Sequence, residues 1–274
     1  NMYNWIKLYF GEFLIKGLLK QYKISLLIII FSSNVFANYD LSAGAAARSY
    51  PSFGFETFAE LGYNKLLYGN APGKGILYGL IRPSVKLASS AVINSYDLKM
   101  EVYPISILGF AAGHQYIKSD FEDFPFYDCD EIRCTGELKK DYIHMRAVLG
   151  YGPIVAIGMV EESRNLYNDP DNENLPVAEF RFAIRANPEY DENHRSQYIL
   201  GYRIDNSMLA IITEYVYFRK SEQFHKLNLL GYQSVTNNHN ITYGLGTFES
   251  SDQELGAVGV VRYIYRFTSN YKLF

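Results

Sequence analysis

The two cysteines of the chain are its most reactive side chains, and their spacing limits what they can do. Cys129 and Cys134 lie in the polar stretch 119–136 with four residues between them. In an exported protein we expect such a pair to form a disulfide, because the compartment outside the inner membrane is oxidising. A bond that closes so short a loop stabilises it by about 2 kcal/mol.

The same stretch is rich in carboxylates, and a second acidic run follows it along the chain. The acidic residues are Asp120, Glu122, Asp123, Asp128, Asp130, Glu131, Asp169, Asp171 and Glu173. Clustered carboxylates suit a surface calcium site, and those beside the cysteines suit a metal pair as the alternative to a disulfide. We favour a solvated loop that faces water or lipopolysaccharide, and no zinc spacing is present. We therefore predict neither a metal nor a cofactor.

Charged side chains recur at every second position within several apolar segments. Residues 178–185 alternate between an apolar face and a face that carries Glu179, Arg181 and Arg185. An arginine that faces lipid at the bilayer midplane costs about 2–4 kcal/mol, so in a membrane wall the charged face must look inward. The predicted inward, pore-lining residues are Arg146, Arg181, Arg185, Arg203, Arg262, Arg266, Glu101, Glu179, Asp205 and Glu254. Rings of charge select ions or charged solutes; paired charges that fill a closed lumen are the alternative.

Two histidines have the neighbours that a hydrolase would need. His239 lies close to Thr242, and His144 precedes Arg146 by two positions on a charged face. A hydrolase requires a nucleophile, a base and a group that orients the base. The segment 238–242 has suitable residue types but matches no known motif, and a histidine in a turn is usually polar surface. We predict no enzyme, with a lipid-modifying hydrolase as an alternative.

The elements that must position these side chains are long strands. The alternating segments are 9–14 residues long, whereas a soluble strand has about 5–6 residues and a tilted membrane strand about 9–11. The predicted strands are 41–49, 53–66, 75–88, 90–103, 105–118, 136–150, 153–165, 177–187, 196–204, 208–219, 224–236, 240–249 and 253–267.

This set of strands conflicts with two rules for bacterial barrels. Thirteen segments are predicted, but single-chain barrels have even numbers, so we expect about 12 strands, with 10 to 14 possible. The weakest segments are 41–49, which is rich in alanine, and 105–118, which alternates poorly. Counting back from the last strand also places 119–135 in the periplasm, although long loops usually lie outside.

The N-terminal residues have the features of a targeting segment. Lys16, Lys20 and Lys23 precede the apolar run 24–31, and Val35-Phe36-Ala37 follows. This order is typical of a secretory signal peptide, and the run is shorter than the roughly 20 residues that span a bilayer. We predict a signal peptide over 1–37 that begins with an over-extended N-terminus; an uncleaved anchor helix is the alternative.

Composition excludes other classes of protein. Hydrophobic residues make up 48% of the chain and aromatic residues 16%, which excludes a disordered protein. The net charge is −3 and no basic stripe is present, so we predict no nucleic-acid partner.

The last predicted strand resembles the C-terminal strand of bacterial outer-membrane proteins. Tyr263, Tyr265 and Phe267 alternate and close the strand on an aromatic residue, which in that family is the signal for the barrel assembly machinery. Residues 268–274 depart from the pattern, because the family usually ends at that phenylalanine; we treat them as a tail. The resemblance covers 41–267 at the level of architecture.

This resemblance implies an all-β, antiparallel transmembrane β-barrel over 38–267 in the bacterial outer membrane. Its implied partners are outer-membrane lipids, lipopolysaccharide and the assembly machinery. By size the chain is similar to twelve-strand barrels, which include small porins, nucleoside channels and a phospholipase, so fold alone does not choose a function. The inward charges favour a porin-like passive channel for small solutes. A structural or surface-recognition barrel that acts through its acidic, disulfide-clipped loop is a further alternative, and a soluble secreted β protein is the alternative at the level of the fold.

Overall fold

The computed structural model describes residues 38–69, 78–90, 92–120, 127–168, 175–179, 181–236 and 238–267. The chain divides into two compact units, 1–39 and 40–274, of which the second contains nearly all of the described residues. The predicted signal peptide and the C-terminal tail lie outside the described residues. Within them, no helix is long and apolar enough to cross a membrane.

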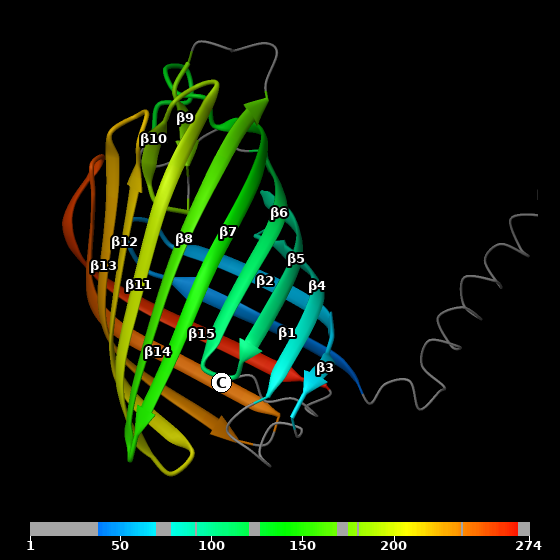
Figure 1. Cartoon of the computed structure of the whole chain (residues 1–274). Helices are drawn as coiled ribbons and strands as arrows, with labels where there is room; N and C mark the ends of the chain where they lie inside the picture. Colours follow the sequence, from blue (N-terminus) through cyan, green and yellow to red (C-terminus); the bar gives the residue numbers. More distant parts are fainter. Residues whose placement is uncertain are drawn as a thin grey trace, which may run out of the picture. The chain divides into compact units, whose positions relative to one another are not determined.

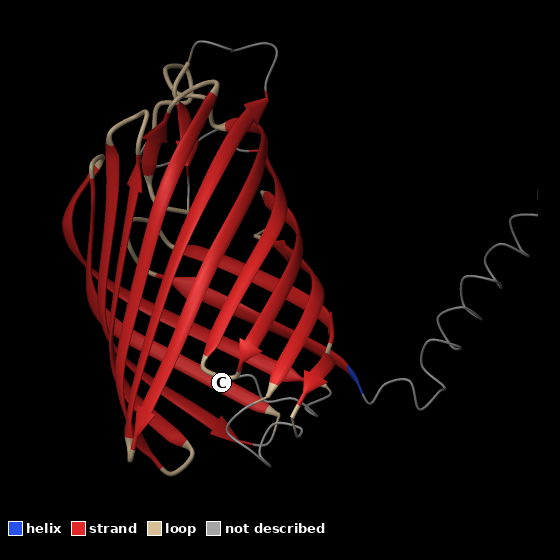
Figure 2. Cartoon of the chain, in the orientation of Figure 1, coloured by secondary structure: helices blue, strands red, loops and turns tan. Residues whose placement is uncertain are grey.

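The second unit is a closed antiparallel wall of strands, drawn in Figures 1 and 2. The wall strands are β1 (Tyr39–Arg48), β2 (Gly54–Tyr63), β3 (Lys65–Tyr68), β4 (Gly79–Ser89), β5 (Ile93–Ile105), β6 (Leu108–Asp120), β7 (Thr135–Tyr151), β8 (Ile154–Asn168), β11 (Tyr190–Ile204), β12 (Ser207–Phe218), β13 (Gln223–Thr236), β14 (His239–Ser250) and β15 (Gln253–Arg266). β2 and β3 are separated only by Asn64 and both pair with β4, so they form one bent strand. β1 pairs with both β2 and β15, which closes a barrel of 12 strands.

The segment 177–187 does not belong to the wall, so its prediction as a wall strand is wrong. It folds as a separate two-stranded hairpin of β9 (Val177–Glu179) and β10 (Ile184–Ala186), with Ile184 opposite Glu179. Ala183 has a positive φ of 53°, which ends the extended conformation and reverses the chain. Without this segment the predicted count becomes even, and the two segments that seemed weakest are the wall strands β1 and β6.

The even count also settles the sidedness of the loops. Both ends of the wall lie at one rim, because strand directions alternate around an even-numbered barrel. The connections from β6 to β7 and from β8 to β11, which are the long ones, then lie at the opposite rim, as Figure 1 shows for the end that carries β9 and β10. The conflict between loop length and strand counting came from the hairpin alone.

The outer face of the wall is a belt of large apolar side chains. Leu245 is 74% exposed, Leu149 63% and Ile143 62%, and all three alternate with side chains that face inward. So many large apolar side chains with such high exposure indicate a surface that contacts lipid and not water. A closed antiparallel barrel with an apolar outer belt is an outer-membrane β-barrel, as the sequence predicted.

Candidate functional site

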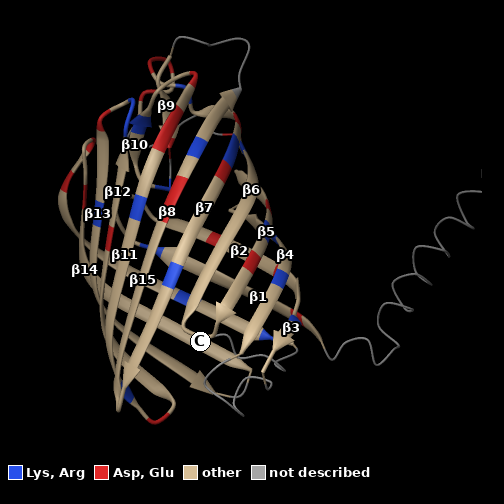
Figure 3. Cartoon of the chain, in the orientation of Figure 1, with Lys and Arg blue, Asp and Glu red and all other residues tan. Residues whose placement is uncertain are grey.

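Charged residues occur on many strands of the wall, as the coloured positions in Figure 3 show. The Nζ atom of Lys140 lies 2.7 Å from Oε1 of Glu161. Arg195 forms an ion pair with Glu214. Gln197 Nε2 also donates to Glu214, at 3.1 Å. Strand register places these residues on the inner face of β7, β8, β11 and β12, with Arg195 directly opposite Glu161 and Gln197 directly opposite Glu214.

A second group of ion pairs lies in the half of the wall formed by β1, β2, β4 and β5, toward the rim of the chain ends. The Arg82 guanidinium lies 2.6 Å from Asp40, 2.8 Å from Glu60 and 2.6 Å from Glu101. Lys99 adds a contact of 3.4 Å to Glu101. A buried guanidinium with several carboxylate partners is stable, whereas loss of the arginine would leave those acids facing one another.

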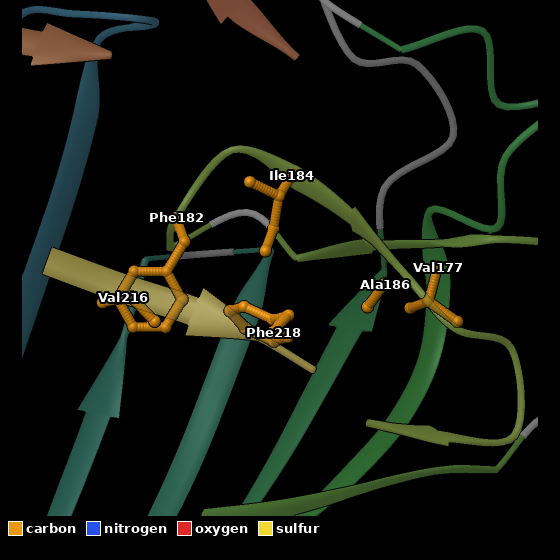
Figure 4. Close-up of a cluster of buried hydrophobic side chains, with 6 residues drawn as sticks. All are labelled: Val177, Phe182, Ile184, Ala186, Val216 and Phe218. Carbon is orange, nitrogen blue, oxygen red and sulfur yellow. The ribbon is translucent and has the colours of Figure 1, made fainter. Parts of the chain in front are cut away.

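The hairpin β9–β10 packs its apolar side chains against the inside of the barrel. Phe182 is 3% exposed and Ile184 is fully buried, in a cluster with Val216 and Phe218 of β12 (Figure 4). The rings of Phe182 and Phe218 meet edge to face with centroids 5.8 Å apart. The inner hairpin, residues 177–186, therefore fills part of the lumen and covers an apolar part of the wall.

A second cluster extends this packing across the neighbouring strands. Ala183 contacts a group made of Leu229 of β13, Phe248 of β14 and Val258 of β15, which are all nearly inaccessible to solvent. Ser250 Oγ donates a hydrogen bond to the Ala183 carbonyl at 2.8 Å. The hairpin thus lies along the inner face of β12–β15.

Two arginines tie the hairpin to the wall and to the β14–β15 turn. Arg48 Nη1 donates to the main-chain carbonyl of Arg181 at 2.6 Å. Arg185 lies 2.8 Å from Asp252, and its hydrogen bond to that carboxylate raises the pKa of Arg185. The apolar contacts and these polar ties fix the hairpin from several sides.

The cysteine loop holds the base of the hairpin. Cys129 and Cys134 form the predicted disulfide, with Cα atoms 5.5 Å apart. The main-chain amide of Arg133 donates to Pro176 at 2.8 Å, and the amide of Ala178 donates back to Arg133 at 3.0 Å. Tyr127, Ile132 and Cys134 pack against Ala178 in a small buried cluster. The loop that seemed a candidate for surface recognition therefore contacts the lumen hairpin directly.

The predicted pore-lining residues fall into two groups. Arg146, Arg203, Arg262, Arg266, Glu101 and Glu254 lie on the inner face of the wall, and Asp205 lies in the turn between β11 and β12. Glu179, Arg181 and Arg185 lie on the inner hairpin, so their placement on the wall was wrong. Their alternation does not divide the hairpin into a wall side and a lumen side: Phe182 and Ala183 both pack against the wall, Glu179 is buried, and Arg185 pairs with Asp252.

Several interior charges were missed in the sequence. Arg195 lies before the predicted strand 196–204, whereas β11 begins at Tyr190 and contains it. Glu214 alternates with Val216 within β12, a pattern that places a carboxylate among inward residues. The cross-strand partners Lys140 and Glu161 required the register between β7 and β8, which no local pattern supplies.

The candidate hydrolase residues are not brought together. His144 lies on the inner face of β7 and stacks on Tyr142 with ring centroids 6.2 Å apart. His239 lies on the outer face, where its Nδ1 is 2.8 Å from the Tyr263 hydroxyl. Thr242 faces the interior, because it is three positions along the strand from His239. His239 and Thr242 therefore point to opposite faces of the wall.

The remaining predicted features concern the last strand and the acidic runs. Tyr263, Tyr265 and Phe267 share the outer face, and the last two rings pack at 4.8 Å. Much of both acidic runs lies outside the described residues. Within the described ranges, no cluster of three or more His, Cys, Asp or Glu side chains could hold a metal ion.

No protein-family model and no curated protein matches the chain. Solved structures are similar to it at low identity. The KdgM porin is 10% identical over 83% of this chain and 99% of that chain, with a TM-score of 0.45. An outer-membrane channel from Pseudomonas putida F1 is 10% identical over 84% and 96%, with a TM-score of 0.45. The NanC porin is 9% identical over 83% and 99%, with a TM-score of 0.44. At such identities the likeness concerns the fold alone.

Proposed function

We propose that the protein is a porin-like passive channel for small solutes. The observation that carries this proposal is the solvent access of charged side chains that face the lumen. Lys86 on β4 keeps 31% of its side chain exposed and Glu56 on β2 keeps 46%. Lys99 on β5 keeps 21%. A dry, fully plugged barrel would bury these groups, because an ion without water or a close partner is costly inside protein.

The water-accessible part of the lumen lies beside β2, β4 and β5, where the inward charged groups keep access to solvent. Small hydrophilic solutes would cross there by diffusion, along a wall that carries charge of both signs. The apolar outer belt fits outer-membrane lipids and lipopolysaccharide as surroundings. The aromatic last strand fits the barrel assembly machinery as the partner during insertion.

The test has two steps. Protein extracted from outer membranes should migrate faster on a gel before boiling than after, as a folded barrel does. The same preparation should then insert conducting units into a planar bilayer. Heat-modifiable protein that never conducts above the lipid background would reject the channel.

A second candidate function is hydrolysis of a lipid ester at the outer face of the barrel. His194 Nδ1 lies 2.7 Å from Glu162 Oε1, and Ser196 lies two positions along β11 on the same outer face, where the apolar belt begins with Tyr198. A carboxylate, an imidazole and a hydroxyl are the groups of a serine hydrolase. Ser196 and the second ring nitrogen of His194 make no hydrogen bond to other described residues.

Purified protein mixed with phospholipid vesicles would test this candidate. Release of fatty acid by the native protein and none by Ser196→Ala would support it. Equal release, or none from either, would remove it and leave the channel proposal untouched.

A further inference from the structure

Arg181 occupies the turn of the inner hairpin and is exposed to the lumen. It lies within electrostatic range of Glu56 on β2, Glu161 on β8 and Glu214 on β12. These carboxylates come from separate parts of the wall, so the guanidinium lies toward the axis of the barrel. A solute that passes the hairpin must pass this charge.

The carboxylates around Arg181 already have cationic partners on the wall. Glu161 pairs with Lys140, and Glu214 pairs with Arg195. Glu56 lies 3.6 Å from Lys86. Each of these wall pairs is close to neutral as a unit, so none of them cancels the charge of Arg181.

The fourth carboxylate near Arg181 is Glu179, at the end of β9. It is buried at 8% exposure, and burial raises its pKa. This shift weakens Glu179 as a counter-charge to its neighbour.

A second cation lies on the wall near the hairpin. Arg262 of β15 is on the inner face and is within electrostatic range of Glu56 and Glu60 as well as of Arg181. Its guanidinium carbon lies 5.2 Å from the centroid of the Phe58 ring. Among the described residues, neither Arg181 nor Arg262 has a carboxylate within the 4.0 Å of an ion pair, and the same holds for Arg266 further along β15.

Three inward carboxylates of the wall, Asp97, Asp191 and Glu254, also lack an ion pair within the described residues. Asp97 lies directly opposite Lys86, and Asp191 accepts hydrogen bonds from the main-chain amides of Glu192 and Lys220. Asp97 accepts a hydrogen bond from the Tyr142 hydroxyl at 2.8 Å. Glu254 lies at the rim of the long loops, where Tyr50 bonds its main-chain carbonyl.

Glu60 and Glu56 are themselves paired with Arg82 and Lys86. Lys86 is within electrostatic range of both Arg181 and Arg262. Arg181 and Arg262 therefore keep positive charge without an ion-pair partner, and Asp97 is the nearby carboxylate that also lacks one.

We propose that Arg181 and Arg262 form an anion-selecting constriction, and that the solutes of the channel are small organic or inorganic anions. This inference rests on the proposed channel and names its substrate class. The hairpin supplies the first cation and the wall supplies the second, with the polar lumen between them. A cation about 6 Å from a passing ion in a water-filled pore changes its local concentration by about threefold.

The test is the reversal potential of the channel in a planar bilayer that separates concentrated from dilute KCl. The native protein should prefer chloride over potassium. Arg181→Gln should lower that preference by about tenfold, because the cation raises the local concentration of chloride and lowers that of potassium by about threefold each. Arg262→Gln should lower the preference in the same direction. Arg164→Gln is the matched control, since Arg164 lies on the outer face of β8 and stacks on Tyr190; it should leave the preference unchanged.

Each variant is used only if it keeps the gel shift of the folded barrel. A conducting native protein that prefers potassium, or an Arg181→Gln channel with native selectivity, would overturn this inference while the channel proposal stands. Protein that folds but does not conduct would reject the channel itself. An equal loss of preference in Arg164→Gln would assign the selectivity to the total charge of the protein and reject the constriction.

Discussion

The two halves of the inner wall differ in the side chains that they direct into the lumen. Strands β12–β15 present apolar groups such as Val216, Leu229 and Phe248, and these are nearly inaccessible to solvent. Strands β2–β8 present ion pairs such as Arg82 with Glu60 and Lys140 with Glu161. One half is covered by protein and the other faces a polar space.

This difference explains why the connection from β8 to β11 turns inward. Apolar side chains that face an aqueous lumen would lose about 25 cal/mol for each Å² left in water, and the hairpin removes that exposure. Charged side chains lose solvation when they are covered, and in the charged half Lys86 and Glu56 keep access to solvent. The composition of each half determines whether it is filled.

The largest expected effect comes from breaking the apolar contact. Phe182→Asp should release the hairpin, because truncating a buried phenylalanine costs about 3–5 kcal/mol and a buried carboxylate adds to that cost. Single-channel conductance should rise, and protease should cut the hairpin. The control is Phe110→Asp, whose parent side chain lies on the outer face at 44% exposure. Native conductance in Phe182→Asp would show that the hairpin does not narrow the pore.

A substitution in the charged half of the wall, β2–β8, should destabilise the barrel without releasing the hairpin. Arg82→Ala leaves Asp40, Glu60 and Glu101 without their shared partner, which should destabilise the barrel by about 3–5 kcal/mol. Lys86→Ala should cost about 0–1 kcal/mol, because its partner Glu56 is exposed. Urea denaturation followed on gels would measure both. Equal urea midpoints for Arg82→Ala and Lys86→Ala would mean that the Arg82 cluster contributes no more stability than an exposed ion pair.

Loss of the disulfide should have a smaller effect. Cys129→Ser removes a short loop closure that contributes about 2 kcal/mol, and so loosens the loop that binds the base of the hairpin. We expect more frequent fluctuations of conductance, and the same fluctuations in native protein after reduction. Reductant should not change the conductance fluctuations of Cys129→Ser. A change in that variant would mean that the reductant acts on a group other than this disulfide.

The smallest expected effect is a dependence of hairpin docking on pH. Burial raises the pKa of Glu179 in the docked hairpin, despite the opposing charges of Lys140 and Arg181. Because the pKa of Glu179 is raised in the docked form, its protonation stabilises docking at a pH below the usual carboxyl pKa. This stabilisation is lost as the pH rises through the raised pKa. Conductance should therefore increase with pH across that range, and Glu179→Gln should remove the dependence. An unchanged pH profile in Glu179→Gln would assign the titration to another group.

The wall was predictable from the sequence because period-two alternation is a local property. Long segments such as 136–150 and 208–219 needed only their own residues to indicate membrane strands. The inward direction of Arg146, Arg262 and Glu101 was predictable because a charged side chain that faces lipid is costly. The aromatic pattern at Tyr263 and Phe267 likewise required no partner.

The hairpin was not predictable from alternation, because a surface that packs against the inside of a barrel has the same pattern as a wall strand. Residues 177–187 differ from the wall strands in two ways. They lie between long polar stretches and not between tight turns, and counting them as a strand gives an odd number of strands. Ion pairs such as Lys140–Glu161 and Arg195–Glu214 depend on register between strands, which one sequence does not supply.

The most direct test of this account compares single-channel conductance of the native protein with that of a variant in which residues 177–186 are replaced by a short Gly-Ser linker. Both proteins should show the gel shift of a folded barrel, and both should conduct. The account predicts a larger conductance for the linker variant, because the lumen beside β12–β15 is then open. Equal conductance would contradict a hairpin that narrows the pore, and two folded barrels without conductance would contradict the channel.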